Sequence, residues 1–234
     1  MHELTNQMMG YDRTSIMFSP DGRLLQVEYA REAVKQGSLS IGIRCKDGVL
    51  IVVDKRITES LIVPEAIEKV FQIDKHIGAT ATGCVMDGRV LIEKAQLIAQ
   101  QHRVTYDVPI DTVSLVKEIC DIKQLYTQLG GARPFGVSLM FIGVDDRPRL
   151  LVTDPIGIYF EYKATAIGEG EVEAKKMLEK EYNENITIEE GIKLAIKIMK
   201  KVLGKEFNLK RIDGAYVDLE KKQFTKINKK KIKW

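Results

Sequence analysis

The sequence predicts an α+β fold, a four-layer αββα sandwich in which two antiparallel sheets are flanked by pairs of helices. Short apolar runs come in pairs joined by turn residues such as Lys46-Asp47-Gly48, a pattern typical of hairpins and therefore of antiparallel strands. Helical patterns also come in pairs, whereas a parallel sheet needs single helices alternating with single strands. No Gly/Ser or Pro linker and no internal repeat divides the 234 residues, so we expect one domain.

Strands are expected where β-branched and other apolar residues are bounded by turn residues. These segments cover residues 39–45, 49–53, 70–73, 77–82, 136–144, 149–153, 157–161, 164–167, 215–219 and 223–227. The first helix is expected from Arg23 to Gln36. It follows the strong turn signal Ser19-Pro20-Asp21-Gly22 and precedes Gly37, a residue suited to end a helix.

Two pairs of helices are expected between the strands. In the first pair, apolar residues recur at helical spacing and mark the buried stripes, which are Leu91, Ala95, Ile98 and His102, then Val113, Val116, Ile119 and Cys120. This position favours a buried, hydrogen-bonded His102 over a metal ligand. The second pair begins near Glu171 and at Thr187, because Thr187 and Glu190 have the spacing of a capping box.

The composition is that of an ordinary globular protein, with 44% hydrophobic and 29% charged residues. No apolar run approaches the roughly 20 residues of a membrane-spanning helix, and the first residues lack the pattern of a secretory signal. Three scattered cysteines without a CxxC pattern favour a reducing compartment, so we expect a cytoplasmic protein. The three histidines lack metal-ligand spacing, and we expect no metal and no cofactor.

The charge of the chain is concentrated at its C-terminal end. Residues 220–234 contain seven lysines and one glutamate, which makes 219–234 a basic tail. Such a tail could bind nucleic acid or an anionic surface. Without interleaved aromatic residues, a solvated chain end is the favoured interpretation, and nucleic acid is not an expected partner.

Several motifs resemble those of α-type proteasome subunits of the archaeal kind. They are Tyr11-Asp12-Arg13, Phe18-Ser19-Pro20-Asp21-Gly22-Arg23-Leu24, Gln26-Val27-Glu28-Tyr29-Ala30, Asp54-Lys55-Arg56, Ile67-Glu68-Lys69, Arg133-Pro134-Phe135-Gly136-Val137-Ser138 and Tyr162-Lys163-Ala164-Thr165-Ala166-Ile167-Gly168. The resemblance covers residues 11 to about 203 and implies the sandwich of N-terminal-nucleophile hydrolases. It also implies a heptameric ring of α subunits, stacked on a ring of β subunits that holds the proteolytic sites.

The resemblance assigns two functional regions. Residues 1–11 would form a gate segment ahead of a domain covering 12–234. A cluster would hold the open gate, formed by Tyr11, Asp12, Pro20 and Tyr29. A pocket between adjacent α subunits would bind the C-terminal tails of AAA+ ATPase activators through Lys69, with Glu28, Leu24 and Gly22 lining the same region. The chain would thus control the entry of unfolded proteins into a degradation chamber.

The alternative is an active peptidase subunit. The β-type relatives cleave themselves after a glycine to expose a threonine whose own α-amine acts as general base. Gly37-Ser38 superficially resembles such a site, and Asp54 and Lys69 fall near the supporting positions. However, cleavage there would remove the whole N-terminal signature, and an uncleaved Ser38 has no free amine beside it. We therefore expect a ring component that is not an enzyme by itself.

Overall fold

The computed structural model describes residues 10–57, 59 and 61–227 and contains two five-stranded sheets. The first sheet has the order β10-β9-β2-β1-β8, formed by β1 (Ser40–Cys45), β2 (Gly48–Asp54), β8 (Ala164–Ile167), β9 (Ile212–Asp218) and β10 (Phe224–Lys226). The second has the order β3-β4-β5-β6-β7, formed by β3 (Val70–Asp74), β4 (Ile77–Gly83), β5 (Val137–Val144), β6 (Pro148–Thr153) and β7 (Tyr159–Glu161). All neighbouring strands are antiparallel, as predicted.

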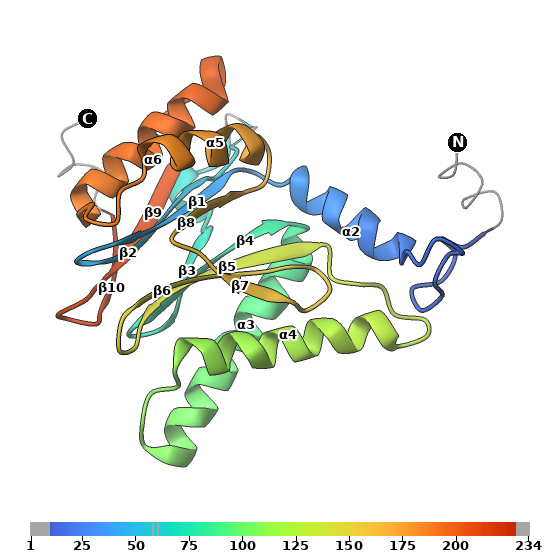
Figure 1. The fold of residues 1–234 in the computed structure, drawn as a ribbon. Coiled ribbons are helices and arrows are strands. Elements are labelled where there is room, and N and C mark those ends of the chain that lie inside the picture. Colours follow the sequence, from blue (N-terminus) through green and yellow to red (C-terminus); the bar gives the residue numbers. More distant parts are fainter. Residues whose placement is uncertain (1–9, 58, 60, 228–234) are drawn as a thin grey trace.

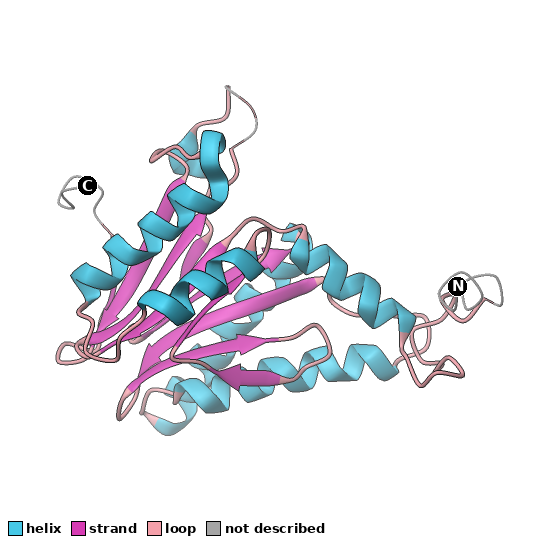
Figure 2. Ribbon diagram, turned by 45° about the horizontal axis from the view of Figure 1, so that its top comes forward, coloured by secondary structure: helices cyan, strands magenta, loops and turns pink. Residues whose placement is uncertain are grey.

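Helices cover the outer face of each sheet (Figures 1 and 2). The first sheet is covered by α5 (Glu171–Glu181) and α6 (Ile188–Leu203), and the second by α3 (Val85–Tyr106) and α4 (Thr112–Gln128). The predicted αββα sandwich is therefore confirmed. Outside these layers, α2 (Leu25–Lys35) extends from the end of the second sheet at which β4 ends and β5 begins. Two short 3₁₀ helices complete the fold, η1 (Pro64–Ala66) and η2 (Gly204–Glu206).

The alternation of side chains along β2 explains why the layers stack. Successive side chains of a strand point to opposite faces. Val49, Ile51 and Val53 therefore pack in the core between the two sheets, whereas Leu50 and Val52 pack in the core beneath the α5–α6 pair. Because both faces are covered, all of β2 is buried, which is why it reads as an uninterrupted apolar run.

The start of α6 follows from its capping residues. The Thr187 hydroxyl accepts a hydrogen bond from the Glu190 backbone N–H (3.3 Å), and the Glu190 carboxylate accepts one from the Thr187 N–H (2.9 Å). These are the reciprocal bonds of a capping box, as predicted.

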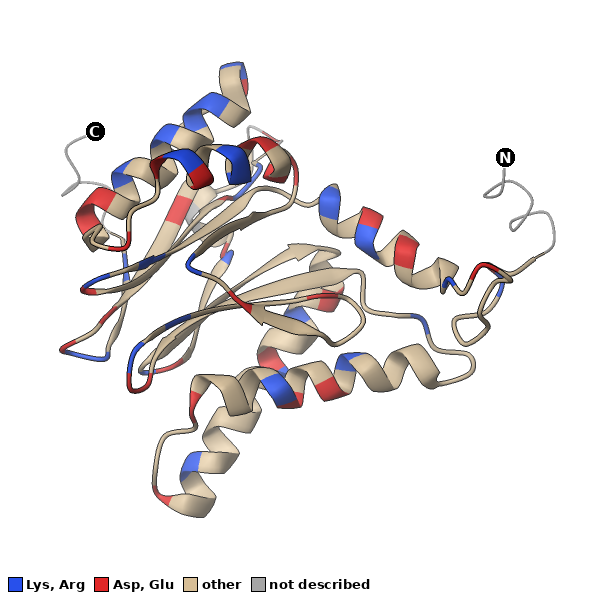
Figure 3. Ribbon diagram, in the orientation of Figure 1, with Lys and Arg blue, Asp and Glu red and all other residues tan. Residues whose placement is uncertain are grey.

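Most lysines, arginines, aspartates and glutamates lie on the helices and connecting loops rather than in the two sheets (Figure 3).

The prediction that His102 lies in the core is wrong. Its side chain is only half-buried, and its Nδ1 lies 3.2 Å from the Val108 carbonyl oxygen. The reason is one of length, since the 22 residues of α3 span about 33 Å and a seven-residue strand about 23 Å. The last turns of α3 therefore extend beyond the sheet (Figure 1).

Across the described part of the chain, no helix is long and apolar enough to cross a membrane.

Candidate functional site

Lys69 lies directly before β3, beside two residues that are distant in sequence. Its ammonium Nζ donates hydrogen bonds to the carbonyl oxygens of Ser38 (2.9 Å) and Asp54 (3.1 Å) and to the Ser38 hydroxyl. Ser38 leads into β1 and Asp54 ends β2, whereas β3 belongs to the other sheet. The Lys69 side chain therefore bridges the two sheets at their shared end.

The charge of Lys69 has no directly contacting carboxylate among residues 10–57, 59 and 61–227. The nearest candidate, Asp54, is buried and accepts hydrogen bonds from Nε (2.9 Å) and Nη2 (2.7 Å) of Arg211. Burial lowers the pKa of Lys69 to about 7, while the negative charge of Asp54 raises it and the positive charge of Arg56 lowers it further. In the described chain the Lys69 ammonium therefore forms no ion pair, and its pKa is lowered.

Lys69 lines a pocket of about 470 Å³. The lining combines apolar side chains with basic ones, namely Ile67, Phe71, Ala81, Val85, Lys55, Arg56 and Arg89. Glu68 supplies the one carboxylate of this lining, and it forms an ion pair with Lys226 outside the pocket. The pocket is suited to an anionic group carried on an apolar chain.

Arg56 has a role at the rim of this pocket that the sequence analysis does not assign. It adopts a left-handed backbone conformation (φ 44°), which is uncommon for a residue with a side chain. Its guanidinium donates to the Gln36 carbonyl oxygen (2.8 Å) and forms an ion pair with Glu169. Arg56 thus ties the end of α2 to the segment between β8 and α5. The Asp54-Lys55-Arg56 motif draws attention to Arg56 in the sequence, but it does not indicate that Gln36 and Glu169 are its partners.

Asp87, in the first turn of α3, fixes the start of the helix that contributes to the pocket. Its carboxylate accepts two hydrogen bonds of 2.7 Å from Arg133 and one of 2.8 Å from the Gly136 N–H. Burial acts to raise the pKa of Asp87, but these hydrogen bonds outweigh it and the pKa lies below its ordinary value. They tie the Arg133–Ser138 motif to the helix that supplies Val85 and Arg89 to the pocket.

The other three residues assigned to the activator pocket lie elsewhere in the single chain. Glu28 is in the first turn of α2 and forms an ion pair with Arg23, and Leu24 precedes that helix. Gly22 is exposed in the preceding turn. None of the three lines the Lys69 pocket within the described chain, so their sharing of one site across adjacent subunits stays a prediction.

Two members of the predicted gate cluster lie together. The Tyr29 hydroxyl donates to an Asp12 carboxylate oxygen at 3.5 Å, and Gln26 Nε2 donates to the Asp12 carbonyl oxygen at 2.5 Å. Tyr11 is half-buried next to Asp12 in the chain. Residues 1–9 of the predicted gate segment lie outside the described residues.

Pro20 occupies the predicted turn ahead of α2. The Gly22 N–H donates to the Ser19 carbonyl oxygen (2.8 Å), and the Arg23 N–H donates to the Ser19 hydroxyl (3.2 Å). Gly22 takes a positive φ of 74°, which glycine adopts at little cost. With the fixed φ of proline at its second position, this turn is stiff.

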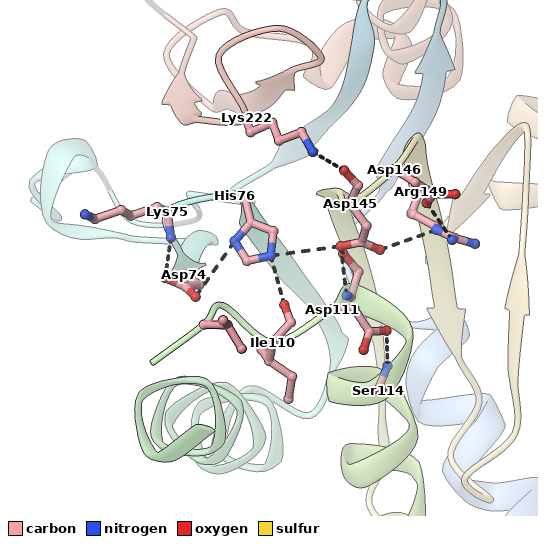
Figure 4. A network of polar contacts seen from close by, with 12 residues as sticks. Asp74, Lys75, His76, Ile110, Asp111, Ser114, Asp145, Asp146, Arg149 and Lys222 are labelled. Carbon is pink, nitrogen blue, oxygen red and sulfur yellow. Dashed lines mark hydrogen bonds and ion pairs between the residues drawn. The ribbon is translucent and has the colours of Figure 1, made fainter. Parts of the chain in front are cut away.

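A second charged cluster lies at the other end of β3 (Figure 4). The His76 ring lies 3.8 Å from an Asp74 oxygen and 3.9 Å from an Asp145 oxygen, and its Nε2 is 2.9 Å from the Ile110 carbonyl oxygen. Asp74 is also held by Arg103, and Asp145 by the backbone N–H and hydroxyl of Thr112. The charged groups of this second cluster contact one another, whereas Lys69 contacts no carboxylate in the described chain. Among the described residues, no group of three or more His, Cys, Asp or Glu side chains could hold a metal ion.

Two family models match this chain. The model described as proteasome subunit matches residues 34–217, and the model of the N-terminal signature of A-type proteasome subunits matches residues 11–33. The chain belongs to the proteasome α-subunit family.

Curated relatives agree with this assignment. The chain is 53% identical over 223 residues to the proteasome alpha subunit of Methanopyrus kandleri, a match covering 95% of this chain and 90% of that protein. The proteasome alpha subunit of Methanocaldococcus jannaschii is 51% identical over 224 residues, and that of Thermococcus sibiricus is 49% identical over 223 residues. Each of these matches covers 95% of this chain and 85% of the relative. The resemblance drawn from the motifs is confirmed.

Membership of the α type decides between the two predicted functions. Subunits of the α type are the non-catalytic members of the proteasome core, so this chain is not an enzyme by itself.

Proposed function

We propose that this member of the proteasome α family forms the heptameric outer ring of the 20S core particle in the cytoplasm. The ring stacks on β subunits that carry the proteolytic sites, admits unfolded protein substrates and docks the C-terminal tails of AAA+ ATPase activators. The free state of Cys45, Cys84 and Cys120 fits a reducing compartment. The observation that carries docking is the Lys69 pocket, whose ammonium forms no ion pair with a carboxylate in the part of the chain that the structure describes.

Assembly into a ring is supported by apolar surface on α3. Large hydrophobic side chains on this helix are exposed, namely Val85, Met86, Val90, Leu97 and Val104. Exposed apolar side chains that recur along one helix are a feature of contact sites for other subunits. Two of these side chains, Val85 and Met86, start the helix beside the Lys69 pocket, which fits a pocket close to the boundary between subunits.

The docking role follows from the chemistry of the pocket. An ammonium group is a suitable point charge for the carboxylate at the end of a protein chain. Apolar side chains next to Lys69 provide surface for the residues before that carboxylate. In the same proposal, the Pro20 turn and the Asp12–Tyr29 contact transmit docking to the gate segment, residues 1–11.

Replacing Lys69 tests the docking role. In particles assembled from this chain and β subunits, we expect Lys69→Ala to reduce activator-stimulated peptide hydrolysis at least tenfold, because the tail carboxylate loses its countercharge. Basal hydrolysis should stay unchanged. The measurement is hydrolysis of a fluorogenic peptide with and without the AAA+ activator.

A matched control is Lys75→Ala, which removes an exposed lysine at the opposite end of β3. It should leave stimulation at the wild-type level. Electron microscopy of each variant should show seven-fold rings, so that loss of stimulation is not loss of assembly. Wild-type stimulation of the Lys69→Ala particle would exclude Lys69 from docking.

A further inference from the structure

The groups that contact the Lys69 ammonium are neutral, so its charge can interact with an anion that enters the pocket. Its three hydrogen-bond acceptors are two carbonyl oxygens and one hydroxyl, all of them neutral. The carboxylates nearby are engaged by other cations: Asp54 by Arg211, and Glu169 by Arg56. A neutral amine can keep the same three contacts, because its two N–H groups donate to the two carbonyl oxygens and its lone pair accepts a hydrogen bond from the Ser38 hydroxyl.

The remaining charged groups of the pocket are basic except for Glu68, which is already paired. Lys55 projects its ammonium toward the loop before β3, where it donates to the carbonyl oxygens of Pro64 (2.5 Å) and Ile67 (3.1 Å). Arg89 from α3 is paired with Glu93, and Glu68 with Lys226. The Cys84 thiol lies on the same lining. Of these groups, none brings an unpaired carboxylate to Lys69.

We propose that docking of a tail carboxylate in the Lys69 pocket is coupled to protonation of Lys69, so that docking weakens as the pH rises above neutral. This inference rests on the docking role proposed above and adds its regulation. The incoming carboxylate supplies a countercharge to Lys69, because Glu68 of the lining is paired with Lys226, and Glu28, predicted to line the same site from the adjacent subunit, is paired with Arg23. The carboxylate is attracted to the ammonium but not to the neutral amine.

The size of the effect follows from linkage. Burial and Arg56 lower the pKa of free Lys69 to about 7 against the opposing effect of Asp54, so half of the pockets hold a neutral amine near neutral pH. A bound carboxylate raises that pKa, and the complex then binds more protons than the free site. The dissociation constant therefore rises by up to tenfold per pH unit above about 7, until the pKa of docked Lys69 is reached.

The probe is a rhodamine-labelled peptide, Gly-Gly-Ser-Leu-Phe-Leu, with a free C-terminal carboxylate. Its binding to assembled particles is followed by fluorescence anisotropy between pH 6.5 and pH 8.5. The expected dissociation constant rises about twentyfold across this range. The decisive variant is Lys69→Arg, because a guanidinium stays protonated throughout and its binding should be nearly flat with pH.

Proton uptake provides an independent readout. Calorimetry at pH 8 in two buffers of different ionisation enthalpy should report about one proton taken up per peptide by the wild type and about none by Lys69→Arg. Binding of the wild type that is independent of pH, or an equal slope in Lys69→Arg, would overturn the coupling while leaving docking intact. If the carboxylate peptide binds no better than its C-terminal amide at every pH, the docking role itself fails, and the coupling fails with it.

Discussion

Lys69 is half-buried and Lys123 is fully buried, yet the two lysines have similar hydrogen-bond partners. The Lys123 ammonium donates to the Val137 carbonyl oxygen (2.9 Å), the Thr153 hydroxyl (2.8 Å) and the Asp154 carbonyl oxygen (3.2 Å). Burial lowers its pKa to about 8, while the nearby Cys120, Asp154 and Asp87 raise it. As at Lys69, three neutral oxygens surround a cation.

The difference lies in what else can reach each cation. Lys123 is 0% exposed and is enclosed between α4, β5 and the end of β6. Lys69 lines a pocket that another molecule can enter. A lowered pKa is therefore a poor marker of a binding site by itself, because a lysine that only ties a helix to a sheet shows one as well. Access from outside is what separates the two.

The largest expected effect is the loss of stability in Lys123→Met. Methionine has nearly the same volume, but it removes the donor of three acceptors, of which the Thr153 hydroxyl still accepts from the Leu139 N–H (3.0 Å). Each acceptor left without a partner costs about 1 kcal/mol or more. We expect the free energy of unfolding to fall by about 3 kcal/mol. Denaturant unfolding followed by circular dichroism measures this change.

The matched variant is Lys69→Met, for which we expect a loss of less than about 1 kcal/mol, because water in the pocket can replace the lysine as donor. Equal losses in the two variants would mean that Lys69 is as much a structural residue as Lys123. The distinction between the two lysines would then disappear.

A smaller effect concerns how stability depends on pH. The pKa of Lys123 is about 8 in the folded chain, against an ordinary value of 10.5. Between these values the unfolded chain binds more protons, so this lysine makes the wild type more stable as the pH rises. The stability gap between wild type and Lys123→Met should therefore widen from pH 8 to pH 10, by at most about 1.4 kcal/mol per pH unit. A constant gap would show that Lys123 has an ordinary pKa.

The same residue shows where sequence patterns fall short. Lys123 lies four residues after Ile119 and therefore on the apolar stripe of α4, yet the predicted stripe ends at Cys120 because lysines are almost never fully buried without a partner. Its acceptors come from β5 and from the end of β6, and only the folded sheet places them there. His102 is the opposite case, a residue on the predicted stripe of α3 that lies past the end of the sheet.

The strands, the helix pairs and the capping box of α6 can all be predicted, since they depend on local periodicity and on turn residues. A short motif singles out Lys69, and only the resemblance to β-type relatives places it near Ser38, because local patterns do not predict that contact. The two residues are 31 positions apart and meet only because β1 and β3 lie in different sheets that face each other. Contacts of this kind depend on topology, which local patterns do not contain.

The smallest expected effect concerns the gate cluster, where the contacts are partly exposed rather than enclosed. The Tyr29 side chain is 39% exposed and its hydroxyl is 3.5 Å from the Asp12 carboxylate, so Tyr29→Phe removes a weak hydrogen bond worth about 0.5 kcal/mol. That energy corresponds to a change of about two- to threefold in an open–closed equilibrium. We expect activator-stimulated degradation of an unfolded protein to slow by this factor, measured on assembled particles.

The control for this variant is Tyr106→Phe, which alters an exposed tyrosine on α3 that is 66% exposed and outside the gate cluster. It should leave protein degradation unchanged. Small peptides test the mechanism further, because a gate that narrows the entrance slows an unfolded protein more than a short peptide. If Tyr29→Phe slowed both substrates equally, or slowed neither, the Asp12–Tyr29 contact would have no part in opening. Its role would then be confined to fixing the start of α2, where Gln26 already holds the Asp12 backbone.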